Sequence, residues 1–370
     1  MKRLHTSALA ELFHDAIQLL RALIATPSPS REEHATATLI QEFFDVRSIP
    51  TERYCNNVWS YNRYYDASKP TLLLNSHHDT VKPVQGWTRS PFDPCIEDTP
   101  SGKVLFGLGS NDAGAALVSL IAAFVHFYHC EELPFNLILA ASAEEEIIGN
   151  NGVEALLPHL GSIAAAIVGE PTNCAMAVAE KGLLVLDCTA HGVAGHAART
   201  TGVNAIDKAL RNILWFHSFR FPRVSEQLGP ITMTVTVINA GTQHNVIPDR
   251  CTFVVDVRTT DAYTHEEIIA IIRSHVDCDV QPRSVRLRPS CIPLNHPLVQ
   301  AAQQLSIPTF ASATLSDQAV MPFPSVKIGP GNSERSHTAD EHIYLAEIEH
   351  GIATYIHLLN TLCTLGRLSA

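Results

Sequence analysis

Short apolar runs that each end at polar side chains recur along this 370-residue chain. The run at residues 71–74, Thr-Leu-Leu-Leu, stops at Asn75 and is followed by His77 and Asp79. Such a run is typical of a buried strand. Because segments with helical spacing of apolar residues alternate with these runs, the sequence predicts an α/β fold with a mostly parallel sheet flanked by helices. In open α/β sheets, ligands bind at the carboxyl ends of the strands.

The predicted elements of the first part follow this alternation. Ser30, with Glu33 three positions on, is predicted to cap the second helix. Helices are expected over residues 6–24, 30–44, 113–129 and 152–160, and strands within 53–61, 71–75, 135–142 and 164–168.

The pattern changes near residue 181 to strand, helix, two strands, helix and strand. This order is that of a ferredoxin-like α+β module. The α/β alternation then resumes, with a helix from His296, short strands near 308–311 and 325–328, and a closing helix over 341–362. We therefore predict a catalytic domain in two parts, residues 1–176 and 290–370, with an inserted module at 177–289.

Composition narrows the function classes. The formal net charge is −11, and the chain has no basic run, which argues against nucleic acid and anionic membranes as partners. The nine cysteines are scattered without a Cys-x-x-Cys pair, a pattern that fits reduced thiols. With no signal-peptide core and no uncharged apolar run of membrane-span length, we predict a cytoplasmic protein.

Polar residues with ligand chemistry stand where the first domain's elements begin or end. Taken singly, each has a plain structural reading: Asp112 as a helix cap, Glu144 to Glu146 as a solvated acidic loop, Glu170 as a turn residue and His337 as a loop histidine. Taken with His77, they predict a site for a pair of metal ions, most simply zinc, because histidine and carboxylate ligands suit that metal.

These motifs, in this order and over essentially the whole chain, resemble the dinuclear zinc amidohydrolase and metallopeptidase family. That family includes acetylornithine deacetylase, succinyl-diaminopimelate desuccinylase, carboxypeptidase G and aminoacylases. The resemblance implies two Zn²⁺ ions, for which Co²⁺ can substitute. It also implies the following roles: His77 and Glu170 on one ion, His337 and Glu146 on the other, Asp112 bridging both, Glu145 as general base, and Asp79 orienting His77.

The inserted module carries a further match. The stretch 191–198, His-Gly-Val-Ala-Gly-His-Ala-Ala, resembles the family's lid motif, and the resemblance implies that His196 stabilises the tetrahedral oxyanion, often from a partner subunit. Asn245 and Arg258 match positions that bind the substrate carboxylate. Two structural alternatives stay open: His196 as an exposed turn residue and Arg258 as a sheet-edge ion pair.

The chain also departs from the family pattern. Many relatives have Asp-Met-Lys-Gly where this chain has Asp-Ala-Gly-Ala from Asp112, and the acidic triplet begins with Glu144 rather than Asp. The second departure leaves the choice of base among the three glutamates open. Both suggest a distinct subgroup and weaken any transfer of substrate.

The resemblance implies hydrolysis of an N-acyl amino acid, most like N-acetylornithine deacetylation in arginine biosynthesis, by a homodimer formed through the inserted domain. The alternatives within the enzyme class are a deacylase of N-succinylornithine or of N-acetyl- or N-succinylcitrulline, succinyl-diaminopimelate desuccinylase, and a di- or tripeptidase. The alternative outside that class is a metal-free binding protein of the same fold.

Overall fold

The computed structural model describes residues 6–199 and 201–368. The chain forms two compact units. Unit 1 comprises Met1–Val178, Ile292–Phe310 and Ser316–Ala370, and unit 2 comprises Ala179–Cys291 and Ala311–Leu315. The last of these segments lies outside the inserted module that the sequence predicts.

Unit 1 is built on a sheet with the strand order β1-β2-β6-β3-β7-β17-β8. The four central strands β6, β3, β7 and β17 run parallel, and β2 pairs with β6 antiparallel. The predicted mostly parallel sheet is therefore confirmed. The strand bounds are β1 Glu52–Tyr54, β2 Asn57–Tyr61, β3 Thr71–His77, β6 Asn136–Ser142, β7 Ala165–Val168, β8 Met176–Glu180 and β17 Ser325–Lys327; β15 (Ser290–Cys291) and β16 (Thr309–Ser312) also pair with β8.

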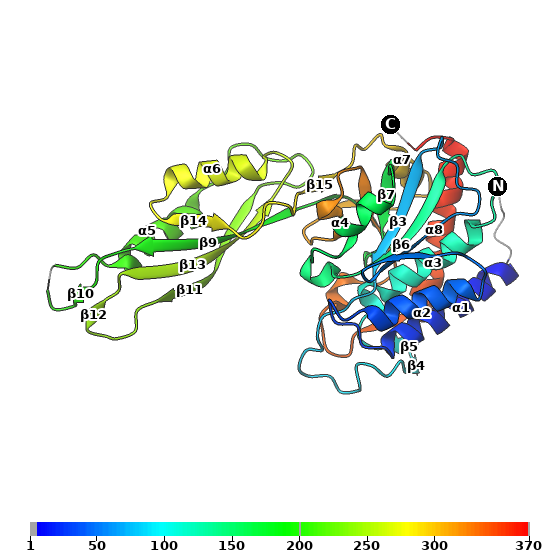
Figure 1. The fold of residues 1–370 in the computed structure, drawn as a ribbon, viewed down its shortest axis with the longest axis horizontal. Coiled ribbons are helices and arrows are strands. Elements are labelled where there is room, and N and C mark those ends of the chain that lie inside the picture. Colours follow the sequence, from blue (N-terminus) through cyan, green and yellow to red (C-terminus); the bar gives the residue numbers. More distant parts are fainter. Residues whose placement is uncertain (1–5, 200, 369–370) are drawn as a thin grey trace. The chain divides into compact units, whose positions relative to one another are not determined.

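Helices cover both faces of this sheet (Figure 1). Successive side chains of a strand point to opposite faces, so Leu72 and Leu74 join one core while Leu73 joins another. The first core contains the helices α1 (Thr6–Ile24), α2 (His34–Asp45), α3 (Ala115–Phe127), α7 (Pro297–Gln304) and α8 (Leu345–Leu365). The second contains α4 (Val153–Leu156) and the turn η3 (Leu157–His159).

The most apolar helical stretch is part of the first core. By length and composition alone, Ser110–Phe127 could cross a membrane, but 78% of it is buried inside the protein. It consists of a short π-helical turn, η1 (Ser110–Gly114), and α3. Its hydrophobicity is that of a core helix.

The predicted cap of the second helix is wrong. The helix α2 begins at His34 with Glu33 before it, and no side chain caps it. Ser30 Oγ instead donates a hydrogen bond to Asp79 Oδ2 at 2.7 Å, and the buried Glu33 accepts one from the N–H of Glu144. Long-range partners therefore take the side chains that the local pattern assigned to the helix end.

A small sheet, β18-β5-β4, brings distant segments of unit 1 together. Its strands are β4 (Ile96–Thr99), β5 (Gly102–Phe106) and β18 (His342–Tyr344), and none of the three was predicted. His342 pairs with Phe106. This register places the segment before β18 beside the segment after β5, with a hydrogen bond from the Gly107 N–H to the Glu341 carbonyl oxygen at 3.0 Å.

Unit 2 has the predicted ferredoxin-like order, β9-α5-β11-β13-α6-β14. Its antiparallel sheet has the strand order β11-β13-β9-β14, and both helices pack on it through a shared apolar core. The bounds are β9 Gly182–His191, α5 Ala205–Ser218, β11 Thr232–Ala240, β13 Arg250–Thr259, α6 His265–His275 and β14 Asp279–Pro282; the short strands β10 (Gly195–His196) and β12 (Val246–Ile247) pair separately. The predicted fold class is confirmed in both units.

Candidate metal centre

Five predicted ligands come together in unit 1, at the carboxyl ends of the parallel strands. His77 is the last residue of β3, and Glu170 follows β7 by two residues. Glu146 lies in the 3₁₀ turn η2 (Glu145–Ile147), which follows β6. Asp112 lies in η1 and His337 precedes β18.

His77 presents one ring nitrogen to the carboxylates. Its Nδ1 lies 3.0 Å from the backbone oxygen of Asp79 and 3.5 Å from that residue's Oδ1. Because a carbonyl oxygen only accepts, Nδ1 carries a hydrogen, and Nε2 is the ring nitrogen that faces the carboxylates. Nε2 lies 3.3 Å from Asp112, 3.8 Å from Glu170 and 3.9 Å from Glu145. This is the arrangement of a histidine prepared to bind a metal.

His337 faces the same centre from a different segment. Its Nε2 lies 2.9 Å from Glu146 Oε2 and 3.5 Å from Asp112 Oδ2. The other carboxylate oxygen of Asp112 faces His77. Asp112 therefore stands between the two histidines, and Glu146 stands on the His337 side.

The pKa values of the carboxylates in this centre are shifted by burial and by their neighbours. Burial raises the pKa of Glu170 to about 8 and raises that of Glu145 well above its usual value, against the opposing effect of His77. For Asp112, burial acts to raise the pKa, but the hydrogen bond and charge of His77, the hydrogen bond of Ser336 and the charge of His337 together lower it. Buried carboxylates at this density repel one another unless a cation neutralises them.

The donor set fits divalent metal ions. One imidazole nitrogen and two carboxylate oxygens lie within 4.8 Å of one another in each of two groups, His77-Asp112-Glu146 and His77-Glu145-Glu170. Imidazole nitrogen with carboxylate oxygen is a usual ligand set for zinc and its neighbours in the first transition row. The chemistry of these residues therefore fits divalent metal ions of this kind.

The three consecutive glutamates point to different partners. The carboxylate of Glu144 accepts hydrogen bonds from the side chain and the backbone N–H of Asn151, at 2.9 and 3.3 Å. Glu145 and Glu146 belong to the two ligand groups. Glu144 is thus engaged in a structural contact, which favours Glu145 as the base among the three glutamates.

Sequence reasoning missed two buried acids near this centre. Asp317 accepts hydrogen bonds from Asn75 Nδ2 and Ser142 Oγ, both at 2.7 Å, and burial raises its pKa to about 6. Glu341 accepts hydrogen bonds from three backbone N–H groups of the Asp112 segment, and burial raises its pKa to about 8. Nothing in the sequence around these two acids indicates that they are buried.

The other predicted site residues lie in unit 2. His196 is exposed in β10, and the N–H of the next residue, Ala197, donates to the Asn245 backbone oxygen at 2.9 Å. Arg258 forms two hydrogen bonds with Asp256 on its own strand, at 2.9 and 3.1 Å. That matches the ion-pair alternative, except that β13 is an interior strand rather than an edge.

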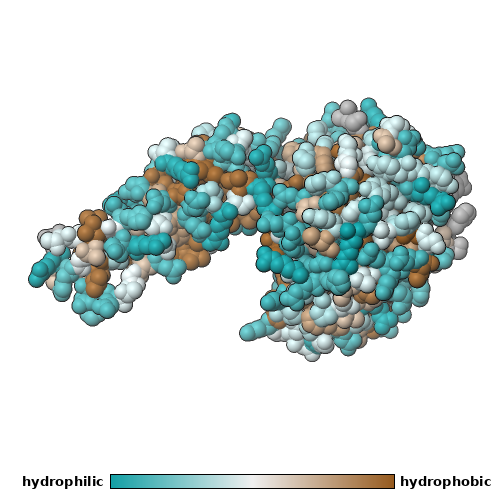
Figure 2. Space-filling model, viewed as in Figure 1, coloured by the Kyte–Doolittle hydropathy of each residue, from teal (hydrophilic) through white to brown (hydrophobic). Residues whose placement is uncertain are grey.

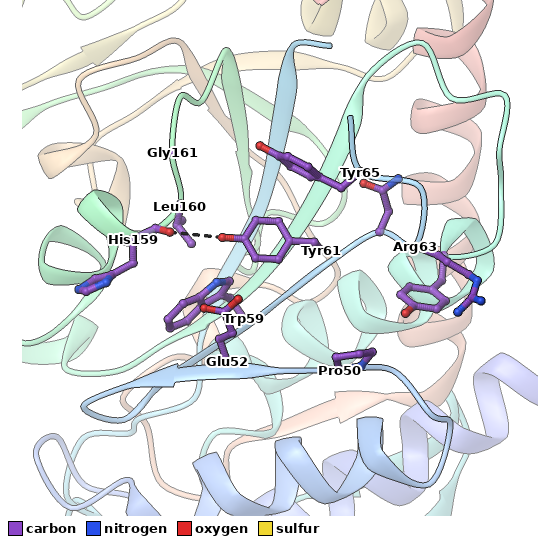
Figure 3. A pocket seen from close by; sticks show the side chains of 11 residues that line it. Pro50, Glu52, Trp59, Tyr61, Arg63, Tyr65, His159, Leu160 and Gly161 are labelled. Atoms are coloured by element: carbon purple, nitrogen blue, oxygen red, sulfur yellow. Dashed lines mark hydrogen bonds between the residues drawn. The ribbon is translucent and has the colours of Figure 1, made fainter. Parts of the chain in front are cut away.

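Unit 1 also has a separate cavity of about 600 Å³. Figure 3 shows the side chains that line it, which include the aromatic residues Trp59, Tyr61 and Tyr65. Tyr61 donates a hydrogen bond to the His159 carbonyl oxygen at 3.3 Å. None of the predicted site residues lines this cavity. The predicted metal ligands therefore lie elsewhere in the unit.

Comparison with known sequences gives relatives of similar length. Residues 178–280 match the peptidase dimerisation domain. The chain is 28% identical to a [LysW]-lysine/[LysW]-ornithine hydrolase of Sulfurisphaera tokodaii, over 94% of this chain and 95% of the relative. It is 25% identical to a succinyl-diaminopimelate desuccinylase of Cereibacter sphaeroides, over 93% and 98%.

Solved structures share the fold. A tripeptidase from Staphylococcus aureus matches with a TM-score of 0.75 at 17% identity, over 95% of this chain and 99% of the other. A dinuclear metal-binding peptidase from Bacillus subtilis matches with a TM-score of 0.69 at 17% identity, over 95% and 98%. At this level of identity the likeness concerns the fold.

Proposed function

Because this chain belongs to the M20 family of metal-dependent peptidases and amidohydrolases, we propose that it hydrolyses the amide bond of an N-acyl amino acid. The observation that carries the proposal is the meeting of His77 and His337 with Asp112, Glu146 and Glu170 beside one partly buried glutamate, Glu145. A binding protein without catalytic activity has no need of a base in that position.

Two metal ions, most simply Zn²⁺ with Co²⁺ as a substitute, would be held by these five residues. His77 and Glu170 would hold one ion, His337 and Glu146 the other, and Asp112 both. When bound, such a pair lowers the pKa of a water molecule toward neutrality and polarises the scissile carbonyl.

Glu145 is the proposed proton carrier. Its Oε2 lies 3.9 Å from His77 Nε2, and its side chain is only 13% exposed. In this role the carboxylate takes a proton from the attacking water and returns it to the leaving amine. Asp79 holds the backbone N–H groups of Glu145 and Glu146, at 3.0 and 3.2 Å, and so keeps the base and a ligand in place.

Three residues of unit 2 complete the proposal. His196 would donate a hydrogen bond to the oxyanion of the tetrahedral intermediate. Asn245 and Arg258 would contact the substrate carboxylate. For Arg258, this requires sharing or leaving its present partner, Asp256.

We further propose a homodimer formed through unit 2. β11 is an edge strand, and the side chain of Ile238 on it is 51% exposed. Leu214 on the adjacent α5 is 65% exposed, and apolar side chains gather on the visible surface of this unit (Figure 2). An apolar edge strand of this kind is usually covered by a partner.

The nine free cysteines agree with the predicted cytoplasmic location.

The relatives help to choose a substrate class. Both names given above concern derivatives of a diamino acid: lysine, ornithine or diaminopimelate. We therefore propose a substrate with an amide on an amino group of such an acid. N-acetylornithine, the sequence-based prediction, belongs to this class, as do its succinylated counterparts. A carboxylate on the acyl side requires a further polar contact, because a buried unpaired charge is costly.

The test is a comparison of kcat/KM with Zn²⁺ or Co²⁺ over six substrates: N-acetylornithine, N-acetylcitrulline, N-succinylornithine, N-succinylcitrulline, N-succinyl-diaminopimelate and a dipeptide. We expect an acylated diamino acid to be preferred by tenfold or more over the dipeptide. A tenfold preference for the dipeptide would replace the proposal with a peptidase. A preference for N-succinyl-diaminopimelate would keep the class and reject arginine biosynthesis.

A further inference from the structure

A buried glutamate outside the predicted ligand set contacts the backbone of Asp112 and of the residues just before it. The side chain belongs to Glu341, which is 2% exposed. One carboxylate oxygen accepts hydrogen bonds from the N–H groups of Asn111 and Asp112, both at 2.9 Å, and the other accepts one from Gly109 at 3.1 Å. Three backbone N–H groups of one short segment thus converge on a single buried carboxylate.

These contacts fix a segment that has no regular helical geometry. Within η1, the backbone of Asp112 has the non-helical angles φ −115° and ψ 102°, and its N–H bonds Glu341. The direction of the Asp112 side chain, 3.3 Å from His77 and 3.5 Å from His337, therefore depends on what holds its N–H. Only a carboxylate has acceptors on both oxygens; a glutamine would turn an N–H₂ group toward one of the amides.

The same segment supplies both the glutamate and a ligand. Glu341 lies four residues after His337, and the small sheet begins immediately after it. Asp340 anchors the segment on its other side by accepting hydrogen bonds from the N–H and hydroxyl of Thr88, at 2.9 and 2.7 Å. One short stretch thus fixes the relative positions of two proposed ligands, His337 directly and Asp112 through its backbone.

We propose that Glu341 is a positioning residue of the metal centre, which sets the Asp112 carboxylate between the two histidines by holding three backbone N–H groups. The inference rests on the proposed metal-dependent function. It assigns Glu341 no contact with metal or substrate. Outer residues that orient metal ligands commonly change metal affinity or activity 10- to 100-fold when replaced.

A positioning role of Glu341 can be distinguished from a purely structural one, because a second contact joins the segment that carries Glu341 to the segment that carries Asp112. Asn111 Oδ1 accepts a hydrogen bond from the N–H of Asn332 at 3.0 Å, and Asn111 Nδ2 donates to the Asn332 carbonyl oxygen at 3.1 Å. The segments therefore stay joined when Glu341 changes. A matched control is Glu347, which binds Arg335 and caps α8 without contacting the Asp112 segment.

The first measurement is amide hydrogen exchange on metal-free protein. Relative to wild type, Glu341→Gln should speed exchange at residues 109, 111 and 112 by about tenfold or more, because one of the two acceptor oxygens is replaced by an N–H₂ donor. The core amides of α3 and β6 should be unchanged, and Glu347→Gln should leave the three amides protected. Unchanged protection in a folded Glu341→Gln protein would overturn the inference.

The second measurement is metal binding, by competition with a chelator and by the Co²⁺ absorption spectrum. Glu341→Gln should weaken affinity by about 10- to 100-fold and alter the spectrum, whereas Glu347→Gln should do neither. Equal losses in both variants would reduce Glu341 to a structural residue. If Glu341→Gln does not fold, Glu341→Asp, which keeps the charge and shortens the reach, is measured with the same expectations.

The two claims fail in different ways. Wild-type protein that binds no metal would contradict the proposed function, while the exchange rates in metal-free protein would still decide whether Glu341 holds the segment. Wild-type protein that binds two ions, with a Glu341→Gln variant of equal affinity and spectrum, would overturn this inference alone.

Discussion

Asp79 Oδ1 accepts a hydrogen bond from the backbone N–H of Glu145 at 3.0 Å, while its Oδ2 accepts one from Glu146 at 3.2 Å. The Ser30 hydroxyl donates to the same carboxylate at 2.7 Å. Asp79 therefore holds the loop that carries the proposed base as well as lying beside His77. A carboxylate two residues after His77 thus contacts both that histidine and the loop of Glu145 and Glu146.

The first prediction concerns this carboxylate. Asp79→Asn should lower kcat by about tenfold or more, because an amide cannot accept hydrogen bonds on both of its ends and the base loses its support. Steady-state kinetics on the best substrate measure the effect. Asp66→Asn is the control, since the carboxylate of the exposed Asp66 accepts its hydrogen bonds from Ser68 in a surface turn. Activity of Asp79→Asn within twofold of wild type would contradict the prediction.

The second prediction separates the adjacent glutamates. Glu145→Gln should retain metal but lose about a hundredfold or more in turnover, as expected when a proton carrier is removed and its shape kept. Glu144→Gln should keep turnover within about tenfold, because its carboxylate serves Asn151. Metal content and kcat are measured for both. Loss of turnover in Glu144→Gln alone would show that the base had been assigned to the wrong residue.

The third prediction concerns His196 in unit 2. His196→Ala should lower kcat by about a hundredfold with a smaller effect on KM, because an oxyanion contact is made mainly in the transition state. If the residue acts across subunits, mixing this variant with Glu145→Gln should restore part of the activity through hybrid dimers. Full activity of His196→Ala alone would return the residue to an exposed turn.

The fourth prediction concerns stability and pH, away from the metal centre. Burial lowers the pKa of His265, whose Nδ1 donates to the Val285 carbonyl oxygen and whose Nε2 accepts from Thr259. Below the unfolded pKa of about 6.5, the unfolded chain then binds more protons than the native one, so stability falls as pH falls toward the lowered native pKa.

Replacing His265 with Gln should therefore flatten the pH dependence of the unfolding free energy between pH 7 and 5, by at most about 1.4 kcal/mol per pH unit for one proton. Urea denaturation at several pH values measures the slope. His275→Gln, exposed at the end of the same helix, is the control. A slope in His265→Gln equal to that of wild type would contradict the assignment.

Much of the fold follows from local pattern. Apolar runs such as Leu72 to Leu74 end where the sheet places polar residues at one edge, so the sequence alone predicts that His77 and Glu170 lie close together. The order of elements in unit 2 follows from the sequence in the same way. These features depend on spacing within one element and on general rules of sheet topology.

The missed features depend on contacts between distant segments. Ser30 has the sequence context of a helix cap but bonds Asp79, 49 residues away. Glu341 lies beside the Asp112 segment because the three-residue strand β18 pairs with β5. That pairing has no sequence signature. Side-chain partners of this kind are decided by tertiary packing.

The central claim is that His77, His337 and three carboxylates hold a pair of metal ions. The most direct test is titration of metal-free protein with Zn²⁺ or Co²⁺, followed by elemental analysis after dialysis. We predict two ions per chain in the wild type and a loss of about one or more in His77→Ala and in His337→Ala. Wild-type protein without stoichiometric metal, or either variant with two tightly bound ions, would contradict the account.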